Sequence, residues 1–257
     1  MTYLIFSDVH GNRFGLEAVL EHAHGEYDAV LCLGDVVGYG AHPNECCEIV
    51  RGLVAASAEG VCLMGNHDAA ALGIIDASWF NHVAREAIEW TAEHLTESNR
   101  TWLHSLSPTH TTEKFQAVHG SLREPLEEYI TSDEIAVGTM EEMTAPLCFY
   151  GHTHIAEAWT VRERKRGLLR RVRSHLTRHK LREGGRVTFR GGAWCLLNPG
   201  SCGQPRDGNR QARYALWNPR YDVVEVFAID YDWQAARAAI LNAGLPHLLG
   251  DRLGMGR

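Results

Sequence analysis

The stretch Tyr3-Leu4-Ile5-Phe6-Ser7-Asp8-Val9-His10 decides how the rest of the chain is interpreted. Its apolar run, followed at once by polar residues, predicts a buried strand over residues 3–7. No basic segment precedes the run, so we interpret it as a strand and not as a signal peptide. No apolar run approaches the roughly 20 residues that span a bilayer. We therefore expect a cytoplasmic protein with no membrane partner.

Strands and helices alternate after this opening. Helices are expected over 14–24 and 43–56, with strands over 29–33 and 61–64. This βαβαβ order favours a parallel sheet covered by helices on both faces. A helical stripe continues over 78–107. Further strands are expected over 115–118, 147–150, 156–161, 187–190, 193–197, 214–217 and 223–229. A final helix is expected over 233–242, and the glycine-rich tail after Gly250 is expected to fray.

The composition suits one large domain over about residues 1–250. The chain has 257 residues, of which 45% are hydrophobic and 22% are charged, enough to bury a core without disulfides. Its seven cysteines include no C-x-x-C pair. They are interpreted as buried thiols in a reducing compartment.

Asp, Asn and His residues follow five of the expected strands. The carboxyl ends of strands in α/β sheets are where ligands bind, so these side chains should meet at one edge. Glycines beside them allow sharp turns or close approaches. The five motifs are Asp8-Val9-His10, Gly34-Asp35, Gly65-Asn66-His67-Asp68, Val118-His119-Gly120 and Gly151-His152-Thr153-His154.

This set of side chains predicts a metal centre. Carboxylate, amide and imidazole ligands suit borderline divalent metals, of which we expect Mn, with Fe, Zn, Co or Ni as alternatives. Seven ligands are too many for one tetrahedral zinc ion. They fit two ions about 3.5–4 Å apart that share a carboxylate and a hydroxide.

In their order, these motifs resemble those of the calcineurin-like metallophosphoesterase superfamily. Within it, the chain is similar to the small prokaryotic phosphodiesterase-like branch. The resemblance implies a fold of two mixed sheets flanked by helices, an α/β (α+β) sandwich of four layers. We adopt this sandwich in place of a single parallel sheet, because the late strands are too many to extend one open sheet. The stretches that carry the closer resemblance are 34–40, 119–125 and the turn Asn198-Pro199-Gly200-Ser201.

The resemblance also implies how the ligands divide. Asp8, His10 and His154 would hold one metal, and Asn66, His119 and His152 the other, with Asp35 bridging. A hydroxide between the metals would attack phosphorus in line while the metals neutralise the phosphoryl oxygens.

Other residues are predicted to handle the substrate. His67 is the candidate proton donor to the leaving group, oriented by Asp68 or another carboxylate. Arg123 is predicted to clamp a phosphate oxygen. Tyr39 and His42 follow the bridging aspartate and are expected to line the substrate cleft. Asn198 and Ser201 are expected to stabilise a tight turn near this edge.

The segment 162–190 departs from the compact pattern of the family. It carries twelve Lys and Arg residues against two Glu, within a chain of net charge −7. One interpretation is an arm that recruits nucleic acid or a nucleotide. The interpretation that we favour is a solvated excursion, since Phe189 is the one aromatic residue available there for base stacking.

The leading hypothesis is a metal-dependent phosphodiesterase that acts on a small phosphate ester or nucleotide. The alternatives are a phosphomonoesterase, of the protein phosphatase or dinucleoside-polyphosphate hydrolase type, and a non-catalytic metal-binding scaffold. Asp68 disfavours the protein phosphatase, where the resemblance would require Glu. The sequence does not specify the substrate, the metal or the oligomeric state.

Overall fold

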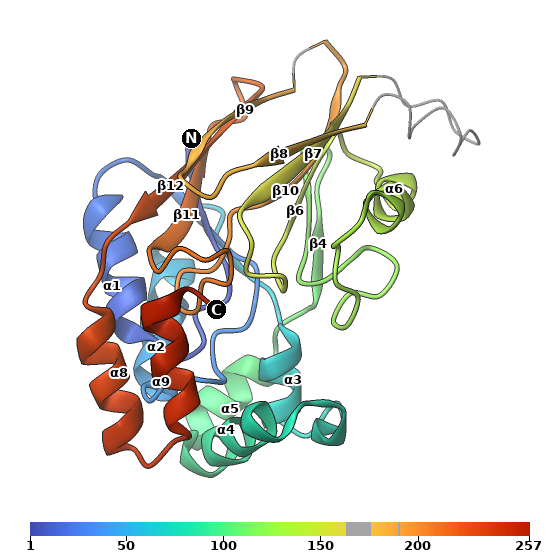
Figure 1. Cartoon of the computed structure of the whole chain (residues 1–257). Helices are drawn as coiled ribbons and strands as arrows, with labels where there is room; N and C mark the ends of the chain where they lie inside the picture. Colours follow the sequence, from blue (N-terminus) through green and yellow to red (C-terminus); the bar gives the residue numbers. More distant parts are fainter. Residues whose placement is uncertain (163–175, 190) are drawn as a thin grey trace.

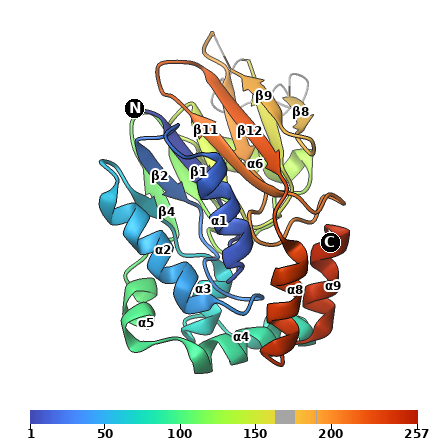
Figure 2. The same ribbon diagram turned by 90° about the vertical axis from the view of Figure 1, so that its left-hand side faces the viewer.

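Two mixed β-sheets packed face to face form the centre of the molecule, with helices outside them (Figures 1 and 2). The structure is a computed structural model that describes residues 1–162, 176–189 and 191–257. Each sheet has six strands among these residues. The predicted sandwich is therefore confirmed.

The first sheet is built around β1 (Tyr3–Phe6). This strand pairs in parallel with β2 and antiparallel with β11, so Ile5 lies between Leu31 and Ala215. The late strand β11 thus inserts beside the first strand of the chain. The sheet has the order β3-β2-β1-β11-β12-β9, with β2 over Ala29–Cys32, β3 over Val61–Cys62, β9 over Gly185–Thr188, β11 over Ala212–Trp217 and β12 over Val223–Ile229.

The second sheet repeats this mixed pairing. Its central strand, β10 (Trp194–Asn198), is parallel to β6 and antiparallel to β7. The order is β4-β5-β6-β10-β7-β8, with β4 over Thr109–Thr111, β5 over Gln116–Val118, β6 over Leu147–Tyr150, β7 over Glu157–Val161 and β8 over Leu176–Lys180.

Both faces of the central strands are buried. Along β1, Tyr3 and Ile5 join the apolar cluster between the sheets, whereas Leu4 and Phe6 join the cluster beneath the outer helices. A strand buried on both faces reads as a continuous apolar run. The opening stretch has that pattern because of this position.

The helices cover the outer faces and one end of the sandwich. Figure 2 shows α1 and α2 over the first sheet, and Figure 1 shows α6 beside the second. The remaining helices gather at the end where the strands deliver their polar residues. Their bounds are α1 Arg13–His22, α2 Pro43–Ala56, α3 Asn66–Ala71, the 3₁₀ helix η1 Ala77–Trp79, α4 His82–His94, α5 Glu97–His104, α6 Asp133–Glu142, α8 Trp233–Asn242 and α9 His247–Met255.

None of the helices in the described part of the chain is long and apolar enough to cross a membrane. The expected helical region 78–107 resolves into η1, α4 and α5, and the hairpin around residues 218–219 is present as β11 and β12. The expectation of a frayed tail after Gly250 is wrong. Helix α9 continues to Met255, because Leu249 and Leu253 pack against α8 and its neighbours.

The basic segment 162–190 supplies one strand to an edge of each sheet, β8 and β9. Residues 163–175 and 190 lie outside the described part, so the predicted nucleic-acid contact of this segment stays a prediction.

Candidate metal centre and its pocket

The seven predicted ligand residues converge at the helix-covered end of the sandwich. One group offers ligand atoms that all lie within 4.8 Å of one another: Asp8, His10, Asp35 and His154. A second group meets the same criterion: Asp35, His119 and His152. All of these residues are buried. Because Asp35 belongs to both groups, it takes the position that a bridging ligand requires.

Asn66, the first residue of α3, completes the second group. Its Oδ1 lies 3.0 Å from Nε2 of His119 and 3.1 Å from Nδ1 of His152. The side-chain oxygen therefore points at the same space as the two imidazoles. The structure brings all seven predicted residues together, and their coordination of metal stays a prediction.

The backbone is left-handed at five of these positions. The φ angles there are positive, between 50° and 64°. Among the described residues, the non-glycine residues with positive φ are Asp8, His10, Asp35, His152 and His154. Such conformations cost about 1–3 kcal/mol each and cluster at functional sites. The tight turns aim consecutive polar side chains at one point, which extended strands would not do.

Two glycines make room for these turns. A Cβ on Gly65 would lie 2.1 Å from Oδ1 of Asp35, and one on Gly38 would lie 2.8 Å from Nδ1 of His67. Gly38 also has a φ of 137°, which favours glycine. Larger residues at these positions would displace the bridging aspartate or the histidine.

Backbone carbonyls orient the four histidines of the two groups. One ring nitrogen of each faces a carbonyl oxygen, at 3.2 Å for His10 with Val37, 2.8 Å for His119 with Leu33, 2.6 Å for His154 with Gln204 and 3.3 Å for His152 with Glu127. A nitrogen that faces a carbonyl must carry the proton, so the other nitrogen keeps its lone pair. In each case that second nitrogen faces the cluster.

The aspartates also have lone pairs to spare. Within the described residues, Oδ2 of Asp8 and Oδ2 of Asp35 are buried without a hydrogen-bond partner. Buried acceptors of this kind are costly unless something else satisfies them. Together with the oriented imidazoles, they fit a divalent cation.

The charged groups of the cluster shift one another's pKa values. Burial raises the pKa of Asp8 to about 7. Burial also acts to raise the pKa of Asp35, but nearby His119, His67 and His10 hold it well below its usual value. For His119, burial lowers the pKa and the charge of Asp35 more than offsets this, raising it to about 9. The positive charge of protonated His119 and the negative charge of Asp35 thus stabilise each other.

The turn Asn198-Pro199-Gly200-Ser201 holds the ligand loops together. Asn198 donates to the carbonyl of Gly151 at 2.6 Å, and Ser201 donates to the carbonyl of Asp8 at 2.8 Å. These two hydrogen bonds support the predicted stabilising role of Asn198 and Ser201. They link the first and last ligand motifs.

His67 and Asp68 differ in their surroundings. His67 lines a pocket beside the cluster, and its Nδ1 has no hydrogen-bond partner among the described residues. The carboxylate of Asp68 instead accepts from the backbone N–H groups of Val37, at 3.0 Å, and Gly65, at 2.9 Å. Asp68 thus ties two ligand loops together, and no contact with the ring of His67 supports its predicted orienting role.

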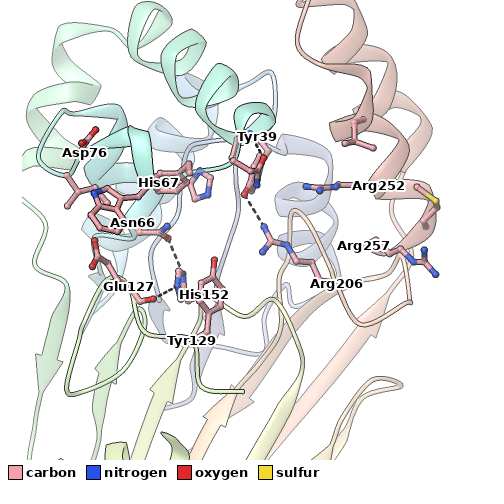
Figure 3. Close-up of a pocket in the computed structure, with 17 residues that line it drawn as sticks. Tyr39, Asn66, His67, Asp76, Glu127, Tyr129, His152, Arg206, Arg252 and Arg257 are labelled. Carbon is pink, nitrogen blue, oxygen red and sulfur yellow. Dashed lines mark hydrogen bonds between the residues drawn. The ribbon is translucent and has the colours of Figure 1, made fainter. Parts of the chain in front are cut away.

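The pocket has a volume of about 680 Å³ and opens directly onto Asn66 and His152 (Figure 3). Tyr39 lines it, as predicted. Arg123 and His42 are not among its lining residues: Arg123 pairs with Glu128, and His42 packs its ring against Phe14. The predicted substrate contacts of Arg123 and His42 therefore stay predictions, and the position of neither residue supports them.

Arg206 lines the pocket and was not singled out from the sequence. Its Nη2 donates to the hydroxyl of Tyr39 at 3.1 Å and to Oε1 of Gln204 at 3.0 Å. Both partners are neutral, and Asp8 is close enough for the two charges to interact. The signal available in the sequence was its position five residues after Ser201, in the loop that the Asn-Pro-Gly-Ser turn brings to the ligands.

Comparison with known proteins agrees with this geometry. The family model of the calcineurin-like phosphoesterase superfamily domain matches residues 1–220. An uncharacterized protein of Methanocaldococcus jannaschii is 32% identical over 98% of this chain and 97% of its own length. The crystal structure of a metallophosphoesterase from Sphaerobacter thermophilus matches with a TM-score of 0.85 and 38% identity, over 100% of this chain and 99% of that one. A hypothetical protein of Pyrococcus horikoshii shares the fold, with a TM-score of 0.77 and 17% identity over 100% and 98% of the two chains. The chain belongs to the calcineurin-like phosphoesterase superfamily.

Proposed function

We propose that the protein hydrolyses phosphodiesters with the help of two divalent metal ions. The observation that carries the proposal is the pair of buried ligand groups that share Asp35 and open onto a pocket through Asn66 and His152. A shared carboxylate between two ligand groups is the arrangement of two-metal hydrolases.

The shape of the pocket favours a diester. Its lining residues lie on both sides of Asn66 and His152, with Asp76 on one side and Arg252 on the other (Figure 3). Phosphorus in a diester carries two organic groups, and a pocket with two arms accommodates one in each. A monoester would leave one arm empty.

The metal ions would supply an activated water and would neutralise the phosphoryl oxygens. Asp8, His10 and His154 would hold one ion, and Asn66, His119 and His152 the other. We favour Mn, because the oxygen and imidazole ligands accept it and no thiolate is present in either group.

Arg206 would bind the phosphate. A partly buried guanidinium without a carboxylate partner is costly, and an anionic substrate would supply the missing charge. Its planar donors suit two phosphate oxygens.

His67 would donate a proton to the leaving oxygen. Burial lowers its pKa to about 4, so the ring is neutral at pH 7 before the substrate binds. The negative charge of a bound phosphate raises that pKa towards the working range of a general acid.

The test is the hydrolysis of bis-p-nitrophenyl phosphate and p-nitrophenyl phosphate, with and without Mn²⁺, by the wild type, Asp35→Asn and the surface control Asp133→Asn. We expect metal-dependent cleavage that prefers the diester, survives in the control and falls at least about 1,000-fold in Asp35→Asn. A preference for the monoester would support the phosphomonoesterase instead. Folded protein that binds metal but cleaves neither ester would support the non-catalytic scaffold.

A further inference from the structure

The pocket beside the metal cluster has arms of different chemistry. Figure 3 shows Arg252 and Arg257 on one side of the cluster residues, and Asp76 and Glu127 on the other. A symmetrical substrate would not need such a difference. The two arms therefore indicate a substrate whose two ends differ in charge.

The basic arm is held in place by the end of the chain. Helix α9 is fixed to α8 by the ion pair between Arg237 and Asp251, at 2.9 Å. The loop that follows Arg206 is fixed to the end of α9, where the N–H of Gly208 donates to the carbonyl of Gly256 at 2.9 Å. These contacts fix the segment that carries Arg206 and the helix that carries Arg252 to each other.

The guanidinium of Arg252 has no acidic partner among the described residues. No hydrogen bond or ion pair joins its guanidinium to another side chain in the described part of the chain, whereas the neighbouring Asp251 is paired. Its side chain is partly buried and lines the pocket. A guanidinium held at a pocket wall without a counter-ion is a binding group for a phosphate.

The opposite arm carries an exposed aromatic side chain. Trp79 on η1 lines the pocket and is 85% exposed, more than any other large hydrophobic residue in the described part. Phe80 beside it also lines the pocket. A nucleobase that stacks on such a side chain gains about 1–3 kcal/mol, and stacking would cover the exposed indole ring.

We propose that the substrate is a nucleotide that carries a second phosphate besides the one that is cleaved, with its base against Trp79 and the second phosphate on Arg252. The proposal rests on the proposed function, because it places the scissile phosphate between these two contacts. The second phosphate could be linked in a chain, as in a nucleoside diphosphate, or attached to the sugar.

The first experiment measures binding without turnover. Isothermal titration in EDTA compares AMP, ADP and adenosine 3′,5′-bisphosphate on the wild type, on Arg252→Gln and on the control Arg220→Gln, an arginine in the turn between β11 and β12. We expect ADP or the bisphosphate to bind at least 10-fold more tightly than AMP, which corresponds to about 1.4 kcal/mol. Whichever of the two gains affinity shows where the second phosphate is attached.

That gain should fall at least 5-fold in Arg252→Gln and stay unchanged in Arg220→Gln. Equal affinity for all three ligands in the wild type would overturn the proposal. So would a gain that survives in Arg252→Gln.

A second titration tests the base. Trp79→Leu should weaken AMP binding about 5-fold and leave ribose 5-phosphate unchanged, while Tyr221→Leu, an exposed aromatic residue outside the pocket, should affect neither. An equal loss for both ligands in Trp79→Leu would remove the base from the proposal.

Hydrolysis of bis-p-nitrophenyl phosphate distinguishes failure of the proposed phosphodiesterase activity from failure of the proposed nucleotide binding. This ester has neither a base nor a second phosphate, so its cleavage by the wild type tests the proposed function alone, and the controls Arg220→Gln and Tyr221→Leu should cleave it at rates within about 2-fold of wild type. If the wild type fails to cleave it but shows the binding gain, the proposed function is wrong and the pocket assignment stands. If cleavage is normal without the gain, the pocket assignment is wrong.

Discussion

The Nε2 atoms of His10 and His154 lie 3.0 Å apart, although 144 residues separate the two histidines in the sequence. Each ring uses its Nδ1 on a backbone carbonyl, so both Nε2 atoms present lone pairs to each other. Two lone pairs at this distance repel unless a cation lies beside them. Two nitrogens bound at right angles to one ion, with bonds of about 2.1 Å, would be about 3.0 Å apart.

Removing one of this pair should empty one site and spare the other. We expect His154→Ala to lower the metal content from about two ions per chain to about one, because Asn66, His119 and His152 keep their positions. His119→Ala should have the same effect on the other site. Inductively coupled plasma mass spectrometry after dialysis measures the content. His110→Ala, on strand β4, is the control and should keep both ions; its losing one would point to a general structural effect.

Arg206→Gln should weaken catalysis without affecting metal content. A hydrogen bond to a charged group contributes about 1.5–3 kcal/mol, so kcat/KM for a diester should fall about 10- to 100-fold. Steady-state kinetics alongside metal analysis measures both effects, with Arg220→Gln as the matched control. An unchanged kcat/KM would show that the guanidinium serves only to hold Tyr39 and Gln204.

The stability of the metal-free protein should fall as the pH rises from about 6.5 to 9. The pKa of His119 is about 9 in the folded protein because Asp35 lies beside it, against 6.5 when unfolded. A raised pKa means that the folded state holds the proton more tightly than the unfolded state. The contribution of this proton to the free energy of unfolding is therefore complete below pH 6.5 and lost by about pH 9. Thermal unfolding in EDTA measures this. Added Mn²⁺ should flatten the dependence, since the ion takes the place of the proton. A melting temperature that rises across this window in EDTA would contradict the assignment.

Asp68→Ala should act on stability more than on chemistry. It would leave the buried N–H groups of Val37 and Gly65 without their acceptor, at a cost of roughly 2–4 kcal/mol. Asp68→Asn keeps one acceptor oxygen and should lose less. Thermal melts measure the loss, and the pH profile of kcat/KM tests the alternative. A shifted profile in Asp68→Asn would show that the carboxylate orients His67 after all.

That these seven residues would lie together was predictable from the sequence, because each motif directly follows an apolar run and the end of a strand is a local property. Strand pairing is not local. Tyr3 pairs with Trp217 across most of the chain, and the two sheets were indicated by the family resemblance and the number of late strands, not by any local pattern. Helix α6 and strands β4 and β8 carried too weak a periodicity to stand out.

The substrate side of the site was harder to predict for a related reason. Arg206 and Arg252 belong to segments far apart in the sequence, which are joined by the hydrogen bond between Gly208 and Gly256. Arg123 looked suitable because it follows a ligand motif, but its guanidinium pairs with the carboxylate of Glu128, five residues further along the chain. A local motif places a residue near the site and does not determine its partner.

The left-handed backbone at the ligand positions implies that the site and the fold have opposing requirements. Alanine normally stabilises a chain relative to glycine, but at a positive φ the order reverses. At position 152, where φ is 64°, His152→Gly should therefore be more stable in EDTA than His152→Ala by about 1 kcal/mol, and thermal unfolding measures the difference. Glycines at these positions would relieve the strain in the backbone but would remove the side chains that form the cluster. The five side chains therefore keep their places in the cluster against the preference of their own backbone.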